Sequence, residues 1–543
     1  MPQTHKPTPR TTGRTKPLWF EGVEVPQFGK LSRDAKADVC IVGAGIAGLT
    51  TAYLLARAGR SVVVLDERPI GGGESGRTSA HLASAIDDRF TTIEQRLGPQ
   101  AAKLQYESHS TAIDTIERIC LAEEIECDFA RVDGFLFLGR GHEPALLQQE
   151  CEAARRAGFH DVGLLDRAPV TGVKSGACLR FPRQARFHPL KYLAGLARTL
   201  QNMGVRIYCG TRVGDLSGDG PVLAKLEGGP LVHARHGVAA TNVPAPIDNW
   251  LAIYTKQASY RSYVVGMEVQ AGVVSDALYW DTEDPYHYVR LAAAPDGRTL
   301  LVVGGADHRV GTLGSNKEAD ARFAEIEGWA RDRFCTEHGK GALGPVAIRW
   351  SGQVAEPDDG VAFLGRVPTA HHRNCFVITG DSGMGLTGGT AGAILVSELI
   401  LREGEGKPDH EVHPWAALYD PARSPARSLG ATVEFLKENA AAAACFSEYL
   451  TGGDVASIEE IPHGSGAVMR DGAGKIAVYK DERGEIHKCS AICTHLKCIV
   501  RWNGLEKSWD CPCHGSRFDP YGRVLMGPAV DDLAPQGSEE EGK

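Results

Sequence analysis

The chain lacks the features that mark membrane, exported and nucleic-acid-binding proteins. Its 543 residues contain no apolar run close to the roughly 18–20 residues that a helix needs to cross a bilayer. The basic N-terminal residues are not followed by an apolar segment, so no signal peptide is predicted. The formal net charge is −9, whereas nucleic-acid-binding proteins usually present a basic face. We therefore expect a cytoplasmic protein that has no membrane span and does not bind nucleic acid.

Cysteine is not scarce, but the 14 cysteines are unevenly distributed. Up to Cys445 they occur singly, which is typical of small buried side chains. Between Cys489 and Cys513 five cysteines are interleaved with histidines, and this pattern indicates a metal site. Because no export signal is seen, a framework of many disulfides is not expected.

Composition divides the chain into five segments, in agreement with a length that suggests several domains. The ends are polar and are predicted to be disordered, whereas an alanine-rich stretch is predicted to be helical. The expected segments are a disordered arm at 1–30, an α/β body at 31–425, a helical connector at 426–452, a small β domain at 453–535 and an acidic tail at 536–543.

A dinucleotide-binding βαβ unit is predicted near the start of the body. The apolar run Val39–Val42 leads into Gly43-x-Gly45-x-x-Gly48, a helical pattern follows, and a second apolar run ends at Asp66. The glycines allow a tight turn, close approach of a pyrophosphate and close helix–strand packing. The helix N-terminus attracts the pyrophosphate, and the carboxylate can bind a ribose diol. The same carboxylate disfavours NADP, and no second GxGxxG unit offers a site for NAD(P)H.

Further motifs point to FAD by resemblance. The segment Phe376–Ser397 reads as a strand, a Gly-rich loop and a helix, which offers a second helix N-terminus to a flavin. Trp350-Ser351-Gly352, Pro357-Asp358 and Phe363-Leu364-Gly365 precede it, and Gly76–Ala80 is a stretch of small and hydroxyl residues. Over about residues 36–425 the chain resembles the flavin-dependent amine and amino-acid oxidases, the D-amino-acid-oxidase-like family.

This resemblance implies an α/β Rossmann-type FAD-binding domain with an inserted mixed β-sheet substrate domain, around residues 254–340. Many amino-acid oxidases of the family carry an Arg two positions after the W-x-G glycine, where this chain has Val354, which weakens the case for an amino-acid substrate. The FAD-binding residues implied are Gly43, Gly45, Gly48, Asp66, Arg77, Thr78, Ser79, Gly380, Gly383, Gly385, Leu386 and Thr387.

Candidate catalytic residues lie on one predicted strand and one loop. In the strand around residues 286–290, alternation places Tyr286, Tyr288 and Arg290 on one face, where they could hold a substrate carboxylate. The alternative is a solvated sheet face. His81 follows the hydroxyl stretch and could approach the flavin ring, although a structural role is the alternative. No catalytic base is assigned.

The cysteine-rich segment contains the boxes C-T-H-L-x-C and C-P-C-H-G-S within residues 489–518. A Cys₂His₂ zinc site is one interpretation, but zinc requires neither the additional cysteines nor the H-G-S sequence. The boxes resemble those of Rieske iron–sulfur proteins, over about residues 455–535. The resemblance implies a 2Fe–2S cluster on Cys493, His495, Cys511 and His514, a disulfide between Cys498 and Cys513, and a covering loop at Gly527–Ala529.

Together the two parts predict an FAD- and iron–sulfur-dependent oxidoreductase. We expect a dehydrogenase that oxidises a small amine- or amino-acid-like substrate by hydride transfer and releases electrons singly through the cluster to an external electron acceptor. One alternative is a flavin oxidase that uses dioxygen and has a structural Rieske domain. Another is a redox carrier or sensor without its own substrate, which could equally take electrons from a donor. A Rieske oxygenase is not predicted, because no two-His-one-carboxylate iron site is apparent.

The ligand set also predicts the redox potential of the cluster. Two neutral imidazoles in place of thiolates raise it into the range of about −150 to +300 mV. By resemblance Ser516 hydrogen-bonds a cluster sulfur, but the Tyr that the high-potential branch carries two residues later is Phe518 here. We predict a midpoint potential below about +250 mV in a redox titration followed by EPR, and a higher value would contradict the assignment.

Overall fold

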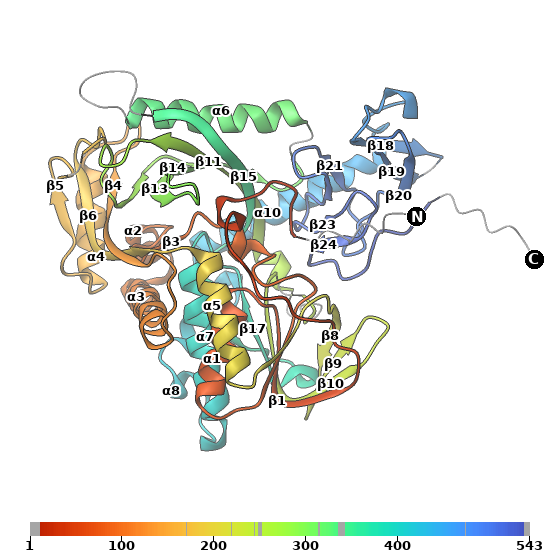
Figure 1. The fold of residues 1–543 in the computed structure, drawn as a ribbon, viewed down its shortest axis with the longest axis horizontal. Coiled ribbons are helices and arrows are strands. Elements are labelled where there is room, and N and C mark those ends of the chain that lie inside the picture. The colour runs from red at the N-terminus through yellow and green to blue at the C-terminus, as the bar shows by residue number, and fades with distance from the viewer. Residues whose placement is uncertain are drawn as a thin grey trace, which may run out of the picture.

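The computed structural model describes residues 11–169, 171–218, 220–243, 245–247, 252–312, 315–334, 343–472 and 474–536. Residues 1–10 of the predicted arm and 537–543 of the predicted tail lie outside the described residues. The described chain forms two large mixed sheets in the body and two small antiparallel sheets at its C-terminal end (Figure 1). None of the helices so described is both long and apolar enough to cross a membrane.

The first sheet has eight strands in the order β16-β17-β10-β1-β2-β7, with β9 paired to β10 and β8 paired to β9. The strands β17, β10, β1, β2 and β7 run parallel, and the core strand β2 is buried along its whole length, as a parallel sheet between helices requires. Helices α1, α5 and α7 pack together beside it (Figure 1). The bounds are β1 Ala35–Val42, β2 Val62–Leu65, β7 Arg206–Tyr208, β8 Val213–Ser217, β9 Val222–Leu226, β10 Leu231–Asn242, β16 Phe363–Arg366, β17 Cys375–Thr379, α1 Ile46–Arg57, α5 Pro189–Asn202 and α7 Gly385–Leu401.

The second sheet has nine strands in the order β15-β11-β14-β13-β12-β4-β6-β3, with β5 attached to β6. Helix α6 contributes Phe323, Ile326 and Trp329 to the apolar core on one face of this sheet. The sheet is wider than the predicted 254–340, because strands from residues 130–186 extend it. The bounds are β3 His81–Leu82, β4 Ala130–Phe137, β5 Gly163–Leu165, β6 Cys178–Arg186, β11 Gln257–Val269, β12 Leu278–Asp281, β13 Tyr288–Ala293, β14 Thr299–Arg309, β15 Leu343–Pro357 and α6 Asn316–Arg333.

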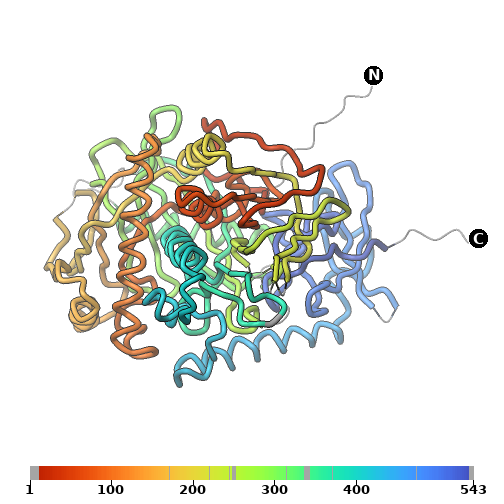
Figure 2. Tube along the Cα trace, turned by 90° about the horizontal axis from the view of Figure 1, so that it is seen from below, coloured from red at the N-terminus to blue at the C-terminus, as the bar shows by residue number. Residues whose placement is uncertain are grey.

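The remaining helices pack around the body or connect it to the C-terminal domain. Helix α10 is capped by the Ser428 hydroxyl, which accepts a hydrogen bond from Ala431 N, and it runs along the molecule toward the C-terminal domain (Figure 2). The bounds are α2 Phe90–Leu97, α3 Pro99–Ala122, α4 Ala145–Arg156, α8 Asp409–Val412, α9 Ala416–Tyr419 and α10 Leu429–Ala444.

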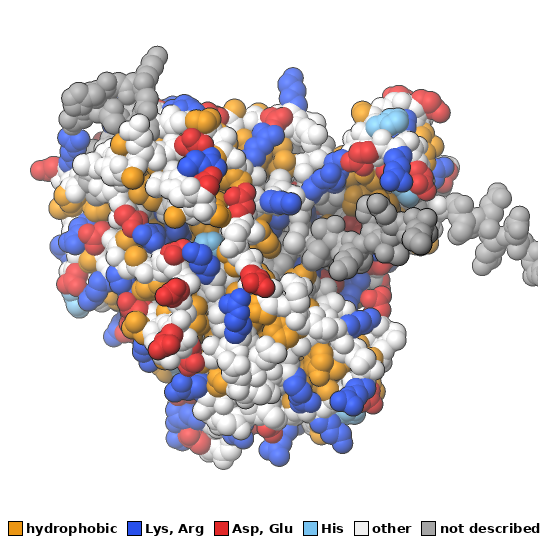
Figure 3. Space-filling model, in the orientation of Figure 1, with side chains coloured by type: hydrophobic (Ala, Val, Ile, Leu, Met, Phe, Trp, Pro, Cys, Tyr) orange, Lys and Arg blue, Asp and Glu red, His pale blue; other side chains and the backbone are white. Residues whose placement is uncertain are grey.

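The C-terminal domain is built from two small antiparallel sheets, which share one core around Trp502 and Trp509. The expected fold class, an α/β body with an inserted mixed sheet and a small all-β domain, is therefore confirmed. Acidic and basic side chains are interspersed over the face of the molecule in Figure 3. The strand bounds are β18 Ser465–Asp471, β19 Gly474–Lys480, β20 Ile486–Ser490, β21 Arg501–Asn503, β22 Ser508–Asp510, β23 Arg517–Phe518 and β24 Val524–Met526.

The N-terminal segment differs from its prediction. Residues 11–30 were expected to belong to a disordered arm, but they pack against the body and the C-terminal domain. Trp19 is buried and donates its Nε1–H to Thr78 O at 2.6 Å. Thr12 is buried, and its carbonyl accepts a hydrogen bond from Arg517. The polar, Pro-rich composition disfavours long regular elements, and the segment forms only a short 3-10 helix at Leu18–Phe20, where Leu18 and Trp19 provide the apolar anchor that holds it in place.

A buried ionic network joins the body to the C-terminal domain. The carboxylate of Glu506, in the turn between β21 and β22, lies 2.8 Å from the Arg77 guanidinium and 3.9 Å from that of Arg261. Both pairs are buried, with side chains at most 2% exposed. The Ser351 hydroxyl donates to Glu506 at 2.6 Å, and the Thr15 N–H donates at 2.9 Å. Three segments of the body and the N-terminal segment therefore converge on one carboxylate of the C-terminal domain.

A second carboxylate completes this network. Asp510 lies 3.1 Å from Arg517 and 3.7 Å from Arg261. Burial acts to raise the pKa of Glu506, but the guanidiniums of Arg77, Arg261 and Arg517 outweigh it and hold the pKa at about 2. Glu506 is therefore ionised at neutral pH, and its negative charge compensates the buried positive charges around it.

Removing this carboxylate should destabilise the protein strongly. We predict that Glu506→Ala lowers the free energy of unfolding by about 3–5 kcal/mol, because it leaves buried guanidiniums without a counter-charge. Chemical denaturation with intact cofactors measures the difference. The control is Asp320→Ala, which breaks an exposed pair with Arg349 and should change the free energy of unfolding by about 0–1 kcal/mol. Equal effects of the two substitutions would contradict the prediction.

Candidate functional site

A cavity of about 320 Å³ extends from the parallel sheet to the second sheet and the C-terminal domain. One end is lined by Gly43, Gly45 and Asp66, which follow the carboxyl ends of β1 and β2. The other end is lined by Tyr286 and Tyr288. Ligands of open α/β sheets bind at this carboxyl edge, so the position is that of a nucleotide cofactor.

The first end fits a dinucleotide pyrophosphate and ribose. Gly43 has φ +110°, and a Cβ atom there would lie 2.2 Å from Ala240 O. Gly45 caps helix α1 without a side chain, the Ile46 N–H donates to the Ser75 hydroxyl at 3.1 Å, and the first residues of the helix line the cavity. The Asp66 carboxylate accepts hydrogen bonds from the N–H groups of Ala44 at 2.6 Å and Arg68 at 2.8 Å, and these hold it at the cavity wall.

The predicted cofactor residues do not all line the cavity. A Cβ on Gly48 would lie 1.9 Å from Gly43 O, so this glycine permits helix–strand packing. Gly380 packs instead against Gln257 and Pro357. The residues that do line the cavity are Gly43, Gly45, Asp66, Arg77, Thr78, Ser79, Gly383, Gly385, Leu386 and Thr387.

A second helix N-terminus faces the cavity from α7. The helix begins at Gly385, earlier than the predicted start near Thr390, and its first turn has no acidic residue. Gly383 has φ +74°, a left-handed conformation that favours glycine in the preceding turn. Free N–H groups at such an N-terminus suit the anionic pole of a flavin ring, so this part of the cavity fits FAD.

The far end of the cavity contains a tyrosine pair. The rings of Tyr286 and Tyr288 lie 5.6 Å apart, and the Tyr288 hydroxyl shares a 2.7 Å hydrogen bond with the Ser262 hydroxyl. The alternation of side chains along the strand predicted Arg290 on the same face, but Arg290 does not line the cavity. Its guanidinium donates to Ala80 O at 2.6 Å and Phe187 O at 2.9 Å. The two tyrosines therefore lie together at the cavity, whereas the arginine binds backbone carbonyl groups.

His81 lies at the cavity wall, with both ring nitrogens engaged. Its Nδ1 shares a 3.0 Å hydrogen bond with the Ser79 hydroxyl, and its Nε2 lies 3.2 Å from Val289 O. Burial, with a smaller contribution from Arg290, lowers the pKa of His81 to about 3. The imidazole is therefore neutral at physiological pH, and its hydrogen bonds support the loop that precedes β3.

Four carboxylic acids at this end were not identified from the sequence: Asp87, Asp307, Glu356 and Asp381. Burial is the main cause that raises the pKa of Asp87 to about 7, of Asp381 to about 7 and of Asp307 to about 6. They come from a loop, from β14, from β15 and from the turn before α7, so no local spacing could have grouped them.

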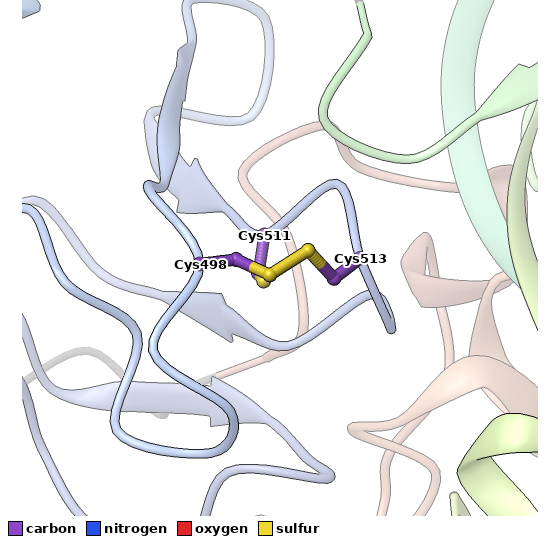
Figure 4. Close-up of side chains that lie close together, drawn as sticks. All are labelled: Cys498, Cys511 and Cys513. Atoms are coloured by element: carbon purple, nitrogen blue, oxygen red, sulfur yellow. A yellow bond between two sulfur atoms is a disulfide. The ribbon is translucent and has the colours of Figure 1, made fainter. Parts of the chain in front are cut away.

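The predicted cluster ligands converge in the C-terminal domain. Cys498 and Cys513 form a disulfide, with Cα atoms 6.5 Å apart, that joins the two ligand loops, and the Cys511 side chain lies beside it (Figure 4). The imidazole centroids of His495 and His514 lie 5.3 Å apart. The first loop precedes β21 and the second follows β22, and because these two strands are antiparallel both loops lie at the same end of the pair.

The donor set fits a Rieske cluster. His514 Nδ1 is buried and has no hydrogen-bond partner in the described part of the chain, so it is available to iron. Cys493 and Cys511 are buried thiols without a disulfide. The hydroxyl of Ser516 accepts a hydrogen bond from Ala529 N at 3.0 Å, which ties the second ligand loop to the predicted covering loop. Two buried thiols and two imidazoles are the ligands of a Rieske centre.

Comparison with known proteins identifies both domains. The family model "FAD dependent oxidoreductase" matches residues 38–399, and the model "Rieske [2Fe-2S] domain" matches residues 453–535. The Bacillus subtilis protein YhfW, described as a Rieske 2Fe-2S iron-sulfur protein, is 27% identical over 518 residues, which cover 95% of this chain and 96% of that protein. The gamma-glutamylputrescine oxidoreductase of Escherichia coli is 29% identical over 223 residues, covering 40% of this chain and 51% of that protein.

Solved structures share the fold of the body. L-proline dehydrogenase from P. horikoshii superimposes with a TM-score of 0.55 at 19% identity and covers 72% of this chain and 98% of its own. Glycine oxidase from Geobacillus kaustophilus gives a TM-score of 0.57 at 17% identity and covers 72% and 99%. At these identities the likeness concerns the fold alone.

Proposed function

Because this chain belongs to the FAD-dependent oxidoreductase family and also carries a Rieske 2Fe–2S domain, we propose that it is an amine dehydrogenase whose electrons leave singly through the Rieske domain. That it is an FAD- and iron–sulfur-dependent oxidoreductase follows from these two domains. The substrate class, the electron route and the use of an external one-electron acceptor are the proposed part.

One observation carries the electron route. The flavin cavity is lined on one side by residues of the Rieske domain, among them Val524, Met526, Gly527 and Ala529. Ala529 is in turn hydrogen-bonded to Ser516, in the second ligand loop. A Rieske domain that served only as structure would not need to form a wall of the cavity, so this arrangement favours electron transfer.

FAD would supply hydride acceptance, and the cluster would supply one-electron transfer. The side chains of this protein hold the two groups in place. The glycines of the β1–α1 turn and Asp66 would hold the pyrophosphate and ribose, while the N-terminus of α7 would face the flavin ring. Cys493, His495, Cys511 and His514 would hold the iron atoms.

The charges at the far end of the cavity favour an amine without a carboxylate. Asp87, Asp307, Glu356 and Asp381 line this end, and no Arg or Lys among the described residues accompanies them there. The basic residues at the cavity lie elsewhere: Arg68 and Arg212 beside Asp66, and Arg77 paired with Glu506. The position where amino-acid oxidases carry an Arg is Val354, which also lines the cavity. An ammonium group therefore finds complementary charge, whereas a carboxylate would be repelled.

The proposed function is tested by anaerobic reduction of the holoenzyme with a panel of amines, amino acids and 2-hydroxy acids. We expect an amine to bleach the flavin and then to produce the EPR signal of the reduced cluster in the same molecule. Cys511→Ser should keep flavin bleaching but lose turnover with a one-electron dye, because it lacks the cluster. Undiminished aerobic turnover of this variant with peroxide release would instead support the oxidase, and a panel without any bleaching would support a carrier or sensor.

The cavity carboxylates also predict a pH dependence. Burial, followed by repulsion from Asp88, Asp307 and Asp381, raises the pKa of Asp87 to about 7. Asp87 is therefore neutral below this pH and negative above it, so a cationic substrate should bind better as pH rises. We expect the KM of an amine substrate to fall by about tenfold between pH 6 and pH 8, and Asp87→Asn to reduce this fall without abolishing it, because the pKa of Asp381 is also about 7. A KM that rises over this interval in the unchanged protein would contradict a cation-binding cavity. Asp133→Asn, in a partly exposed pair with Arg180, is the control and should keep the profile.

A further inference from the structure

The imidazole side of the Rieske domain faces the flavin-binding body. Tyr254, in the short 3-10 helix η4 (Ile253–Thr255) before β11, places its ring 4.5 Å from the centroid of His495 and 5.1 Å from that of His514. The ring planes are nearly perpendicular, at 88° and 81°, which is a favoured edge-to-face geometry. A single aromatic side chain of the body thus contacts both predicted imidazole ligands.

The backbone beside His514 is bound to the long strands of the body. The Ser259 hydroxyl on β11 donates to His514 O at 3.3 Å, and Gln353 Nε2 on β15 donates to Gly515 O at 3.0 Å. Gly515 has φ +77°, and a Cβ atom there would lie 2.3 Å from Ser259 Cβ. Only glycine permits this approach, so the ligand loop is held directly against the two strands.

Gln353 contacts both the flavin cavity and the ligand loop. It lines the cavity together with its neighbours Gly352 and Val354. Its backbone N–H donates to the Glu74 carboxylate at 2.7 Å, and its side chain, 4% exposed, reaches Gly515. One hydrogen bond and a short stretch of covalent structure therefore connect the cavity wall to His514.

We propose that Gln353 and Tyr254 form the junction that couples the flavin cavity to the imidazole side of the cluster. Gln353 provides the bonded route to His514, and Tyr254 is a positioning residue that fixes the orientation of both imidazoles. Coupling between sites is carried by such contiguous packed and hydrogen-bonded contacts. This inference deepens the proposed function and rests on its electron route.

The number of electrons released by the substrate determines how many electrons the junction must carry. Oxidation of an amine to an imine releases two electrons and two protons. Each passage through the junction would carry one electron to the cluster, so two passages would be needed per substrate. An external one-electron carrier must reoxidise the cluster after each passage, and the two protons leave to solvent.

The test uses light-driven reduction of the flavin in the holoenzyme by a sacrificial electron donor, EDTA, so that no substrate is required. The rate at which the cluster EPR signal then appears reports transfer across the junction. Gln353→Met keeps the side-chain length but removes the donor to Gly515, and we expect it to slow this rate by about tenfold with flavin and cluster contents unchanged. Gln201→Met, on the exposed end of α5, is the matched control and should leave the rate unchanged.

Tyr254 is tested by the spectrum of the reduced cluster rather than by activity. Tyr254→Leu removes the ring between the two imidazoles and should alter the EPR line shape and slow the transfer, whereas Tyr254→Phe retains the ring and should restore both. Unchanged transfer in Gln353→Met together with an unchanged spectrum in Tyr254→Leu would overturn the inference. Because light replaces the substrate, transfer that persists when no amine bleaches the flavin would count against the proposed substrate class and leave the junction intact.

Discussion

The burial of the Glu506 carboxylate between the two parts of the chain is the constraint on which the rest of the arrangement depends. A charge removed from water must find counter-charges at fixed positions, and here they come from Arg77 in the flavin-binding stretch and Arg261 on β11. A shifted docking position would separate these charges from the groups that compensate them. The ion pairs need not contribute much net stability, but they specify one docking position.

That docking position explains why several local features occur together. Arg77 donates to Ser351 O at 2.8 Å and its own carbonyl accepts from Trp350 Nε1 at 2.9 Å, so the W-S-G motif is tied to the flavin-binding stretch. Gly515 then lies against Ser259, and the loop around Gly527 forms a wall of the cavity. The flavin site and the cluster site are thus two ends of one packed interface.

Sequence patterns predicted the parts of the sites that are local in the chain. The G-x-G-x-x-G turn and the two cysteine–histidine boxes each lie within a short segment, because backbone geometry requires those residues at fixed spacing. The acids Asp87, Asp307 and Glu356 could not be grouped, since they come from separate loops and strands that only the folded sheet brings together. Tyr254 likewise had no motif around it. Residues 11–30 were expected to be disordered because the prediction was based on overall composition. Composition does not show that a single tryptophan is buried.

The two ends of the cavity differ in charge because different segments of the chain form them. Backbone N–H groups of the β1–α1 turn line the end that would hold the pyrophosphate, whereas buried carboxyl groups gather at the other end, beside the N-terminus of α7. Burial raises the pKa values of these acids toward neutrality, so their charge depends on what occupies the cavity. A cationic substrate would stabilise the ionised forms and a neutral product would not. Binding of the substrate and release of an uncharged product can therefore both be favoured by one set of side chains.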